Sequence, residues 1–283
     1  MYLLGVTPTN TVQQVGAWAY GMESVESTVS AWTGIKEIFA EDGFVAGLTN
    51  TGTVLSAWKP SIASWATNNL QSATGWTGIK QLAMNSDGIV GLKEDGTVLI
   101  TSSDASLSVS GWAGITQVKA DGIVVGLKSD GTMVYTGIAR NYNNTSDVDF
   151  SALLTWTDIV QFAVSERFVV GVRSDGTVVI TGELRNDVSL CQNWTGIISI
   201  ACGPFHVVGL KSDGTVVALG GANAIGELNV GSWTGVRRVY AGIQWSAGVK
   251  DDGTVVSTFD TTLLNDAGYD PNYTNVNSWT VPL

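Results

Sequence analysis

A short motif that begins with tryptophan recurs along the chain, and this repeat constrains the fold more than any other feature. The tryptophan is followed by Thr or Ala, then Gly or Asp, then Ile or Val, and a shortened copy ends the chain. The motifs are separated by 36 to 46 residues, a period typical of propellers, solenoids and arrays. The repeats begin at Trp32, Trp76, Trp112, Trp156, Trp194 and Trp233, and the shortened copy begins at Trp279.

Each repeat contains three apolar runs that alternate with polar residues, as in Ile35–Ala40. The second run ends in Gly-Leu or Gly-Val, and a two-residue turn leads to the third. Asp-Gly between alternating runs predicts a type I′ hairpin turn, and the first repeat has Thr51-Gly52 instead. The turns predict a β-meander in every repeat, and they lie at Asp95-Gly96, Asp130-Gly131, Asp175-Gly176, Asp213-Gly214 and Asp252-Gly253.

The predicted fold is all-β. Val, Ile and Thr are frequent in the runs, and no helical period survives the regular Gly interruptions. A four-stranded antiparallel repeat cannot bury both faces alone, so it must stack on its neighbours, and radial closure removes the exposed edges. We therefore expect a seven-bladed β-propeller that occupies residues 1–283 as a single domain.

The two ends of the chain predict how this propeller closes. Residues 3–16 align without a gap on residues 207–220, with Asn10 at a Gly position that Asn tolerates. The segment 279–283 begins a repeat that nothing follows. We expect residues 1–16 and 279–283 to form the seventh blade together, with a first strand that is short or broken by Pro282.

Charge and hydropathy exclude several classes of function. The formal net charge is −11, with 14 basic residues that form no run, so nucleic acid is not an expected partner. The apolar runs are too short for a membrane helix. The first basic residue is Lys36, so we expect no secretory signal. We expect the chain to be synthesised in the cytoplasm. Cys191 and Cys202 are too few for a disulfide framework, and their pairing would depend on the compartment.

The segment Ile197–Val216 has the pattern Ile-x-x-Ile-Ala-x-Gly-x-x-His-x-x-Gly-Leu-Lys-Ser-Asp-Gly-Thr-Val. This pattern resembles the regulator of chromosome condensation repeat, and the resemblance covers nearly the whole chain. It implies a seven-bladed propeller. That family includes nucleotide exchange factors, ubiquitin-ligase modules and a bacterial β-lactamase inhibitor. The family's loop histidine is present only at His206, and other repeats carry Phe44, Gly88, Ile123, Phe168 and Trp245 there.

Several repeated residues are better explained by structure than by chemistry. One tryptophan per repeat is what packing between neighbouring sheets requires, and the Asp-Gly aspartates are too far apart to share a calcium ion. His206, Cys191 and Cys202 make no metal centre or nucleophilic site by themselves. We expect no catalytic residues, no metal and no cofactor, and hence not an enzyme.

Binding residues are expected where the repeat is interrupted. Length varies most in residues 56–75, 136–155 and 257–278, and a second set of aromatic residues precedes the second strand of several repeats. Aromatic residues beside Asn and Ser are typical of recognition surfaces, although some of these rings could cover the ends of blades instead. The candidates are Trp58, Trp65, Tyr142, Asn143, Phe168, Phe205, His206, Trp245, Tyr269 and Tyr273.

The predicted function is a non-enzymatic protein-interaction or attachment module. Its Thr-, Ser-, Asn- and Gly-rich, Lys-poor composition resembles that of phage virion and tail proteins, which suggests a virion or another external assembly as its place of action. The expected partner is another protein, without nucleic acid or membrane insertion. A carbohydrate-binding lectin is one alternative, and a proteinaceous enzyme inhibitor is another.

Overall fold

A computed structural model of the chain describes residues 3–7, 9–15, 23–41, 44–59, 71–85, 88–102, 106–183, 186–221, 223 and 226–258. This part of the chain is built of short antiparallel sheets and a few helical turns. Residue contacts divide the chain into two compact units. Unit 1 comprises residues 1–129 and 134–137, and unit 2 comprises residues 130–133 and 138–283.

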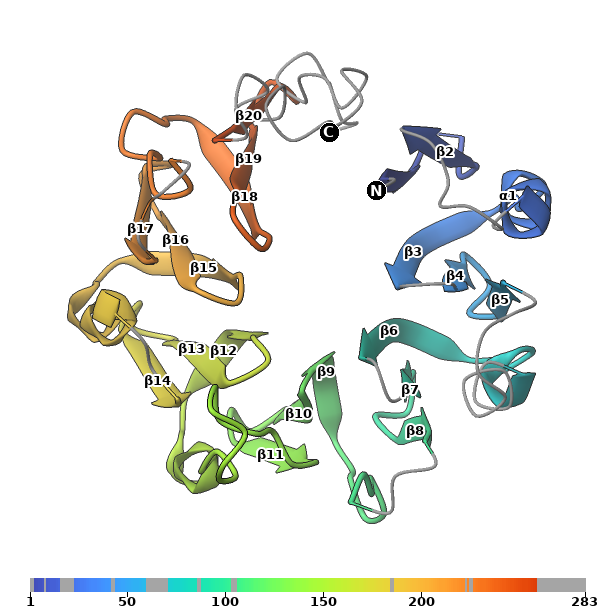
Figure 1. The fold of residues 1–283 in the computed structure, drawn as a ribbon, viewed down its shortest axis with the longest axis horizontal. Helices are drawn as coiled ribbons and strands as arrows, with labels where there is room; N and C mark the ends of the chain where they lie inside the picture. Colours follow the sequence, from blue (N-terminus) through green and yellow to red (C-terminus); the bar gives the residue numbers. More distant parts are fainter. Residues whose placement is uncertain are drawn as a thin grey trace. The chain divides into compact units, whose positions relative to one another are not determined.

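Unit 1 begins with the two-stranded sheet of β1 and β2, which is followed by helix α1 (Figure 1). Each following sheet has three strands, with the second strand in the middle. Residue Met133 of β11 belongs to unit 2. The elements are β1 (Leu3–Val6), β2 (Val12–Val15), α1 (Glu23–Ser30), β3 (Ile35–Glu41), β4 (Phe44–Thr49), β5 (Val54–Trp58), β6 (Ile79–Asn85), β7 (Gly88–Lys93), β8 (Val98–Thr101), β9 (Ile115–Asp121), β10 (Ile123–Lys128) and β11 (Met133–Thr136).

Unit 2 contains three sheets of the same kind, each with its middle strand buried along most of its length. Two 3-10 helices precede the first two sheets. The elements are η1 (Ser151–Thr155), β12 (Ile159–Val164), β13 (Phe168–Arg173), β14 (Val178–Gly182), η2 (Asn186–Asn193), β15 (Ile197–Cys202), β16 (His206–Lys211), β17 (Val216–Gly220), β18 (Val236–Ala241), β19 (Ser246–Lys250) and β20 (Val255–Ser257).

Three strands, and not the expected four, form each complete sheet in the described residues. In the described residues, the segments before Trp156 and Trp194 do not extend the sheet as a regular strand. They form helical turns at η1 and η2, and η2 packs against both β14 and β17. These turns cover the outer strands, whose unpaired edges would otherwise be open to pairing with another chain. The four-stranded blade is therefore not confirmed.

The hairpin turns differ from the predicted type I′ geometry, which needs a positive φ at both central residues. Gly96 has a φ of +82°, whereas Asp95 is not among the residues with a positive φ. The Gly96 N–H donates to Lys93 O, and the Lys93 N–H donates to Thr97 O, which is a three-residue loop with a bulge at glycine. The Asp95 carboxylate accepts hydrogen bonds from the Thr97 N–H (2.9 Å) and hydroxyl (2.6 Å). Aspartate is therefore used for its carboxylate, and the same contacts recur at Asp130, Asp175, Asp213 and Asp252.

The N-terminal hairpin has the register that the sequence predicts. Leu3 pairs with Val15 in β1–β2 as Val207 pairs with Leu219 in β16–β17. Asn10 adopts a φ of +58°, and its carbonyl accepts a hydrogen bond from the Ile35 N–H (2.8 Å). Residues 279–283 lie outside the described residues, so the seventh blade and the closure by both termini stay predictions.

The repeated tryptophans pack as the sequence suggests. Within each sheet the ring lies on a glycine of the second strand, so a Cβ added at Gly47 would stand 2.9 Å from the Trp32 ring. The Trp76 carbonyl accepts a hydrogen bond from Val54 of the preceding sheet (3.0 Å), which links that sheet to the next. The structural explanation is confirmed for the six described motifs, whose other ring pairs are Trp76 on Gly91, Trp112 on Gly126, Trp156 on Gly171, Trp194 on Gly209 and Trp233 on Gly248.

Candidate functional site

Three loops of unit 2 lie at the strand ends opposite the Asp-Gly turns, where they join the first strand of a sheet to the second. They comprise residues 165–167, 203–205 and 242–245. The last two loops touch, since a Cβ added at Gly203 would collide with the carbonyl oxygen of Gly242. A longer loop, residues 138–149, contacts the first two. Together these loops form the candidate site.

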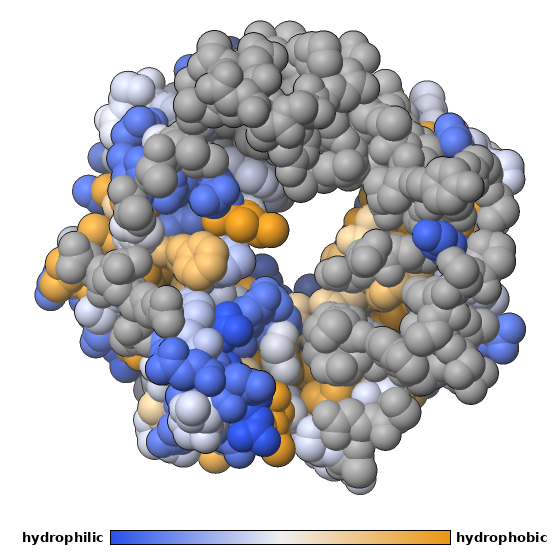
Figure 2. All heavy atoms as spheres, viewed as in Figure 1, coloured by the Kyte–Doolittle hydropathy of each residue, from blue (hydrophilic) through white to orange (hydrophobic). Residues whose placement is uncertain are grey.

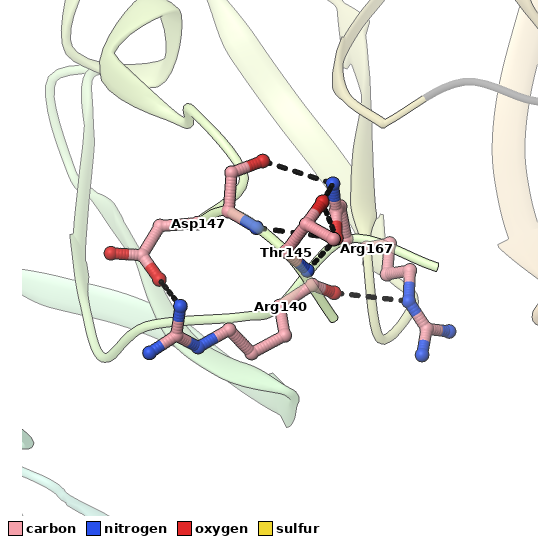
Figure 3. A network of polar contacts seen from close by, with 6 residues as sticks. Arg140, Thr145, Asp147 and Arg167 are labelled. Atoms are coloured by element: carbon pink, nitrogen blue, oxygen red, sulfur yellow. Dashed lines mark hydrogen bonds and ion pairs between the residues drawn. The ribbon is translucent and has the colours of Figure 1, made fainter. Parts of the chain in front are cut away.

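The 138–149 loop is held by hydrogen bonds of its own (Figure 3). The Asn141 N–H donates to Ser146 O (3.0 Å), and the Asn141 Oδ1 accepts from the Thr145 N–H (2.8 Å). Arg140 and Asp147 form a bridge across the base of the loop, with an ion pair of 3.1 Å. The 138–149 loop is therefore held by contacts within itself.

Tyr142 connects this loop to three other segments of unit 2. Its N–H donates to the Glu183 carboxylate (2.7 Å), and its hydroxyl donates to Pro204 O (3.1 Å). The guanidinium carbon of Arg167 lies 4.3 Å from the centre of the Tyr142 ring. The Phe205 ring stacks beside it, with centroids 6.2 Å apart and planes inclined by 21°. These contacts fix the position of the tyrosine ring.

Arg167 is itself positioned by hydrogen bonds. Its Nε donates to Arg140 O (3.1 Å; Figure 3). Its Nη1 pairs with the Glu166 carboxylate. The Arg167 carbonyl accepts from the Glu183 N–H (2.8 Å). A guanidinium held over an aromatic face is stabilised by the negative charge of that face. The cation and the ring are thus locked together.

Beside this stack the surface is partly apolar. Phe205 is 38% exposed and Ile243 is 61% exposed. The Trp245 ring folds over the backbone of Gly242, where a Cβ would collide with it. Figure 2 shows apolar atoms gathered on this face, next to strongly polar ones. We name this area the contact surface, and it consists of Tyr142, Arg167, Phe205, Ile243 and Trp245.

Four of the predicted binding residues belong to this surface or its margin: Tyr142, Phe205, Trp245 and the exposed Asn143. Trp58 ends β5 in unit 1, where it packs partly buried against a core cluster. Trp65, Tyr269 and Tyr273 lie outside the described residues.

Two of the predicted residues do not face solvent. Phe168 and His206 open the second strands of their sheets, and both are buried. Phe168 packs with Val188 and Cys191 in a core cluster. Neither ring is therefore exposed for direct contact with a partner, and their role in binding stays a prediction.

Sequence reasoning missed Glu183 and Ile243. Ile243 could have been found from the repeat, since it holds the loop position that Glu166 and Pro204 hold in the two preceding sheets. Glu183 follows β14 outside the repeated pattern, and its role depends on where the 138–149 loop lies. No pattern in the sequence indicates that contact.

His206 forms a buried polar chain below the contact surface. Its Nε2 lies 3.1 Å from the Ser246 Oγ, and that hydroxyl donates to Glu227 O (2.7 Å). Burial lowers the pKa of His206, while the charge of Glu227 and the backbone of Trp245 act in the opposite direction. Through its contact with Ser246, the His206 ring joins the sheet of β16 to that of β19.

The other reactive side chains are accounted for by structure. Cys191 and Cys202 form no disulfide bond with each other, and burial raises the pKa of the Cys191 thiol to about 12. Hydrogen bonds from Thr97 lower the pKa of Asp95, as matching threonines do at Asp175, Asp213 and Asp252. No group of three or more His, Cys, Asp or Glu residues suited to a metal ion occurs in the described part of the chain. In the same residues no helix is long and apolar enough to cross a membrane.

Comparison with known proteins identifies similar folds among solved structures but no related family. No protein-family model matches, and no curated protein matches. Among solved structures, Prp20p from Saccharomyces cerevisiae aligns with a TM-score of 0.59 at 17% identity, over 88% of this chain and 81% of that one. Yeast RCC1 (Prp20) bound to Kap60 aligns with a TM-score of 0.58 at 14% identity, over 79% and 69%. The C-terminal domain of gp131 from bacteriophage phiKZ aligns with a TM-score of 0.51 at 13% identity, over 84% and 81%. The likeness shows a β-propeller fold.

Proposed function

We propose that this chain is a non-enzymatic protein-interaction module and that it binds its partner through the contact surface of unit 2. The observation that carries the proposal is the stack of Arg167, Tyr142 and Phe205, which is held by hydrogen bonds on several sides and still leaves Phe205 partly exposed.

The composition of this surface is that of an interface centre. Aromatic residues and arginine are the side chains that most often dominate binding energy, and they do so where polar neighbours exclude water around them. Asn143, Asn144, Thr145 and Ser146 form such an exposed polar margin. Because Tyr142 and Arg167 are already fixed, binding loses little side-chain entropy, which favours affinity.

The structural neighbours support a protein as the class of partner. The yeast Prp20p structure is described with its binding to Gsp1p and histones, and another shows that protein bound to Kap60. For this chain we propose a protein partner on the contact surface, without nucleic acid, because the acidic chain repels phosphate backbones. A place in a virion or attachment assembly stays a prediction. It is supported by the phage protein domain only in that the two folds are similar.

The geometry favours a protein over a glycan at Tyr142. A sugar-binding aromatic ring offers an open face to the ring of the sugar. Here the Arg167 guanidinium already lies over the tyrosine ring, and Phe205 stacks beside it. The lectin alternative would therefore need other aromatic residues of the chain.

Site-specific photocrosslinking in the native cells tests this proposal. A photoreactive amino acid replaces Phe205 in one variant and Asp213, in the turn at the other end of the same hairpin, in a control. We expect a discrete protein adduct from position 205, none from position 213, and loss of the adduct when Arg167→Ala is added. Equal labelling from both positions, or an adduct indifferent to Arg167→Ala, would contradict the proposal.

A further inference from the structure

We propose that His206 is an acid-sensitive latch that holds together the two loops, residues 203–205 and 242–245, that carry Phe205, Ile243 and Trp245. The proposal concerns the conformation of these loops and does not depend on the identity or existence of a protein partner. His206 is the single histidine of the sequence.

The hydrogen bonds determine the neutral form of the ring. The Ser246 hydroxyl has one proton and donates it to Glu227 O at 2.7 Å. It must therefore accept from the His206 Nε2 at 3.1 Å, so Nε2 carries the proton and Nδ1 is a bare acceptor. The neutral ring thus ties β16 to β19 and, through Ser246, to the segment that contains Glu227.

Burial disfavours a second proton on the ring, and the charge of Glu227 and the backbone of Trp245 offset this only in part. Nδ1 is buried, and no residue in the described part of the chain makes a hydrogen bond with it. Protonation at Nδ1 would create an imidazolium inside the protein, where charge is poorly solvated. Hydration of that ring requires a covering loop to move away.

The covering loops are identified by close contacts. A Cβ added at Gly203 would lie 2.9 Å from the His206 Cε1 and would collide with the Gly242 carbonyl, so these two glycines close over the ring. Neither the 203–205 loop, nor residues 242–246, nor Gly220 and Gly221 carry an ionisable side chain. Glu227 is the acidic group that acts on the ring, and the Cys202 thiol stands at the start of the first loop.

Acid should therefore loosen the loops that carry three of the five residues of the contact surface, while the 138–149 loop keeps its own hydrogen bonds. The chain offers a matched control. Phe168 holds the position of His206 in the preceding sheet, buried and without a titratable group. His206→Phe is thus a change that the fold already accommodates elsewhere.

NMR titration of the full chain tests the premise, because a single histidine gives a single set of ring resonances. We expect a pKa below the ordinary value of about 6.5 and the Nε2-protonated tautomer at neutral pH. A pKa at or above that value, or a neutral ring protonated at Nδ1, would overturn the latch.

Hydrogen exchange read by mass spectrometry tests the consequence. After correction for the intrinsic pH dependence, peptides that cover residues 203–208 and 241–248 should exchange about tenfold faster near pH 5 than near pH 7.5. The corresponding peptide at residues 165–170 should not change. In His206→Phe the acid effect should disappear; if that variant does not fold, His206→Gln, which can donate to Ser246 without titrating, takes its place. Equal acid responses in the wild type and the variant would refute the proposal.

Discussion

Units 1 and 2 are built from the same repeat and present different surfaces. In the described residues every large apolar side chain that is strongly exposed lies in unit 2. All six arginines of the chain also lie there, whereas six of the eight lysines lie in unit 1. The exposed apolar residues are Ile138, Leu154, Val160, Leu190, Ile198, Phe205, Tyr240 and Ile243.

One repeat position shows that the fold does not require this difference. The second residue of each first strand lies at an irregularity in the pairing, and in unit 1 it is polar. There Lys36 donates to Lys80 O (2.7 Å), and Thr116 donates to Leu127 O (3.1 Å). In unit 2 the same position is Val160, 48% exposed, in the first sheet and Ile198, 55% exposed, in the second. In the third sheet it is Arg237, whose Nε donates to Lys250 O (3.1 Å). Since the backbone geometry is shared, the fold itself accepts either a polar or an apolar residue at this position.

The largest expected effect tests what the two units share. Gly47→Ala in unit 1 and Gly209→Ala in unit 2 each place a methyl group under 3.0 Å from a tryptophan ring. We expect each to lower the free energy of unfolding by about 1–3 kcal/mol, as overpacking does. Urea denaturation measures it. A large loss in one unit and none in the other would show that the tryptophan–glycine contact is not a common foundation.

A smaller effect on stability should come from the Arg167–Tyr142 contact, which occurs in unit 2 and is not part of the repeated pattern. Arg167→Ala removes the cation over Tyr142 and the hydrogen bond to Arg140 O, and should cost about 1–2 kcal/mol of unfolding free energy. Arg167→Lys should not restore it, because an ammonium lacks the planar fork of a guanidinium. Arg140→Ala, which breaks an exposed ion pair in the same loop, is the matched control and should cost about 0.5 kcal/mol or less. Similar losses for both arginines would remove the special role given to the stack.

The pH dependence of stability should also differ between wild type and His206→Phe. The folded-state pKa of His206 lies below its unfolded value, so the unfolded chain binds more protons and stability falls as the pH drops below about 6.5. His206→Phe should lack this decline between about pH 6.5 and pH 5. Thermal unfolding across that range measures the difference. If the stability of wild type and His206→Phe fell in parallel with pH, the decline would have to come from carboxylates and not from His206.

The smallest expected effect concerns the turns common to both units. Asp95 and Asp213 have a lowered pKa in the folded state, so their contribution is present at neutral pH and is lost as the pH falls below about 4. Asp95→Thr and Asp213→Thr copy Thr51 of the first turn and should lower the melting temperature slightly at pH 7. The difference between the variants and wild type should shrink as the pH falls below about 4. A difference that persists in acid would mean that the carboxylate charge is not what holds Thr97 or Thr215.

Much of the fold was predictable because it repeats. Strand positions follow from alternation, and the register of β1 on β2 follows from the overlay on β16 and β17. The turn geometry was not predictable from Asp-Gly alone, since the carboxylate of Asp95 binds Thr97 and only Gly96 takes the positive φ. The expected fourth strand is not confirmed in the described residues, where segments such as η1 form helical turns that leave no alternating pattern.

By itself the sequence determined which residues form the three strands of each repeat and where the hairpins turn, because these depend on local periodicity within one repeat. Only the tertiary structure decided which loop rings are available to a partner. Phe205 and His206 are neighbours in the chain, yet one is partly exposed and the other is buried. Successive residues point in opposite directions, and the adjacent sheet covers one direction and leaves the other to solvent.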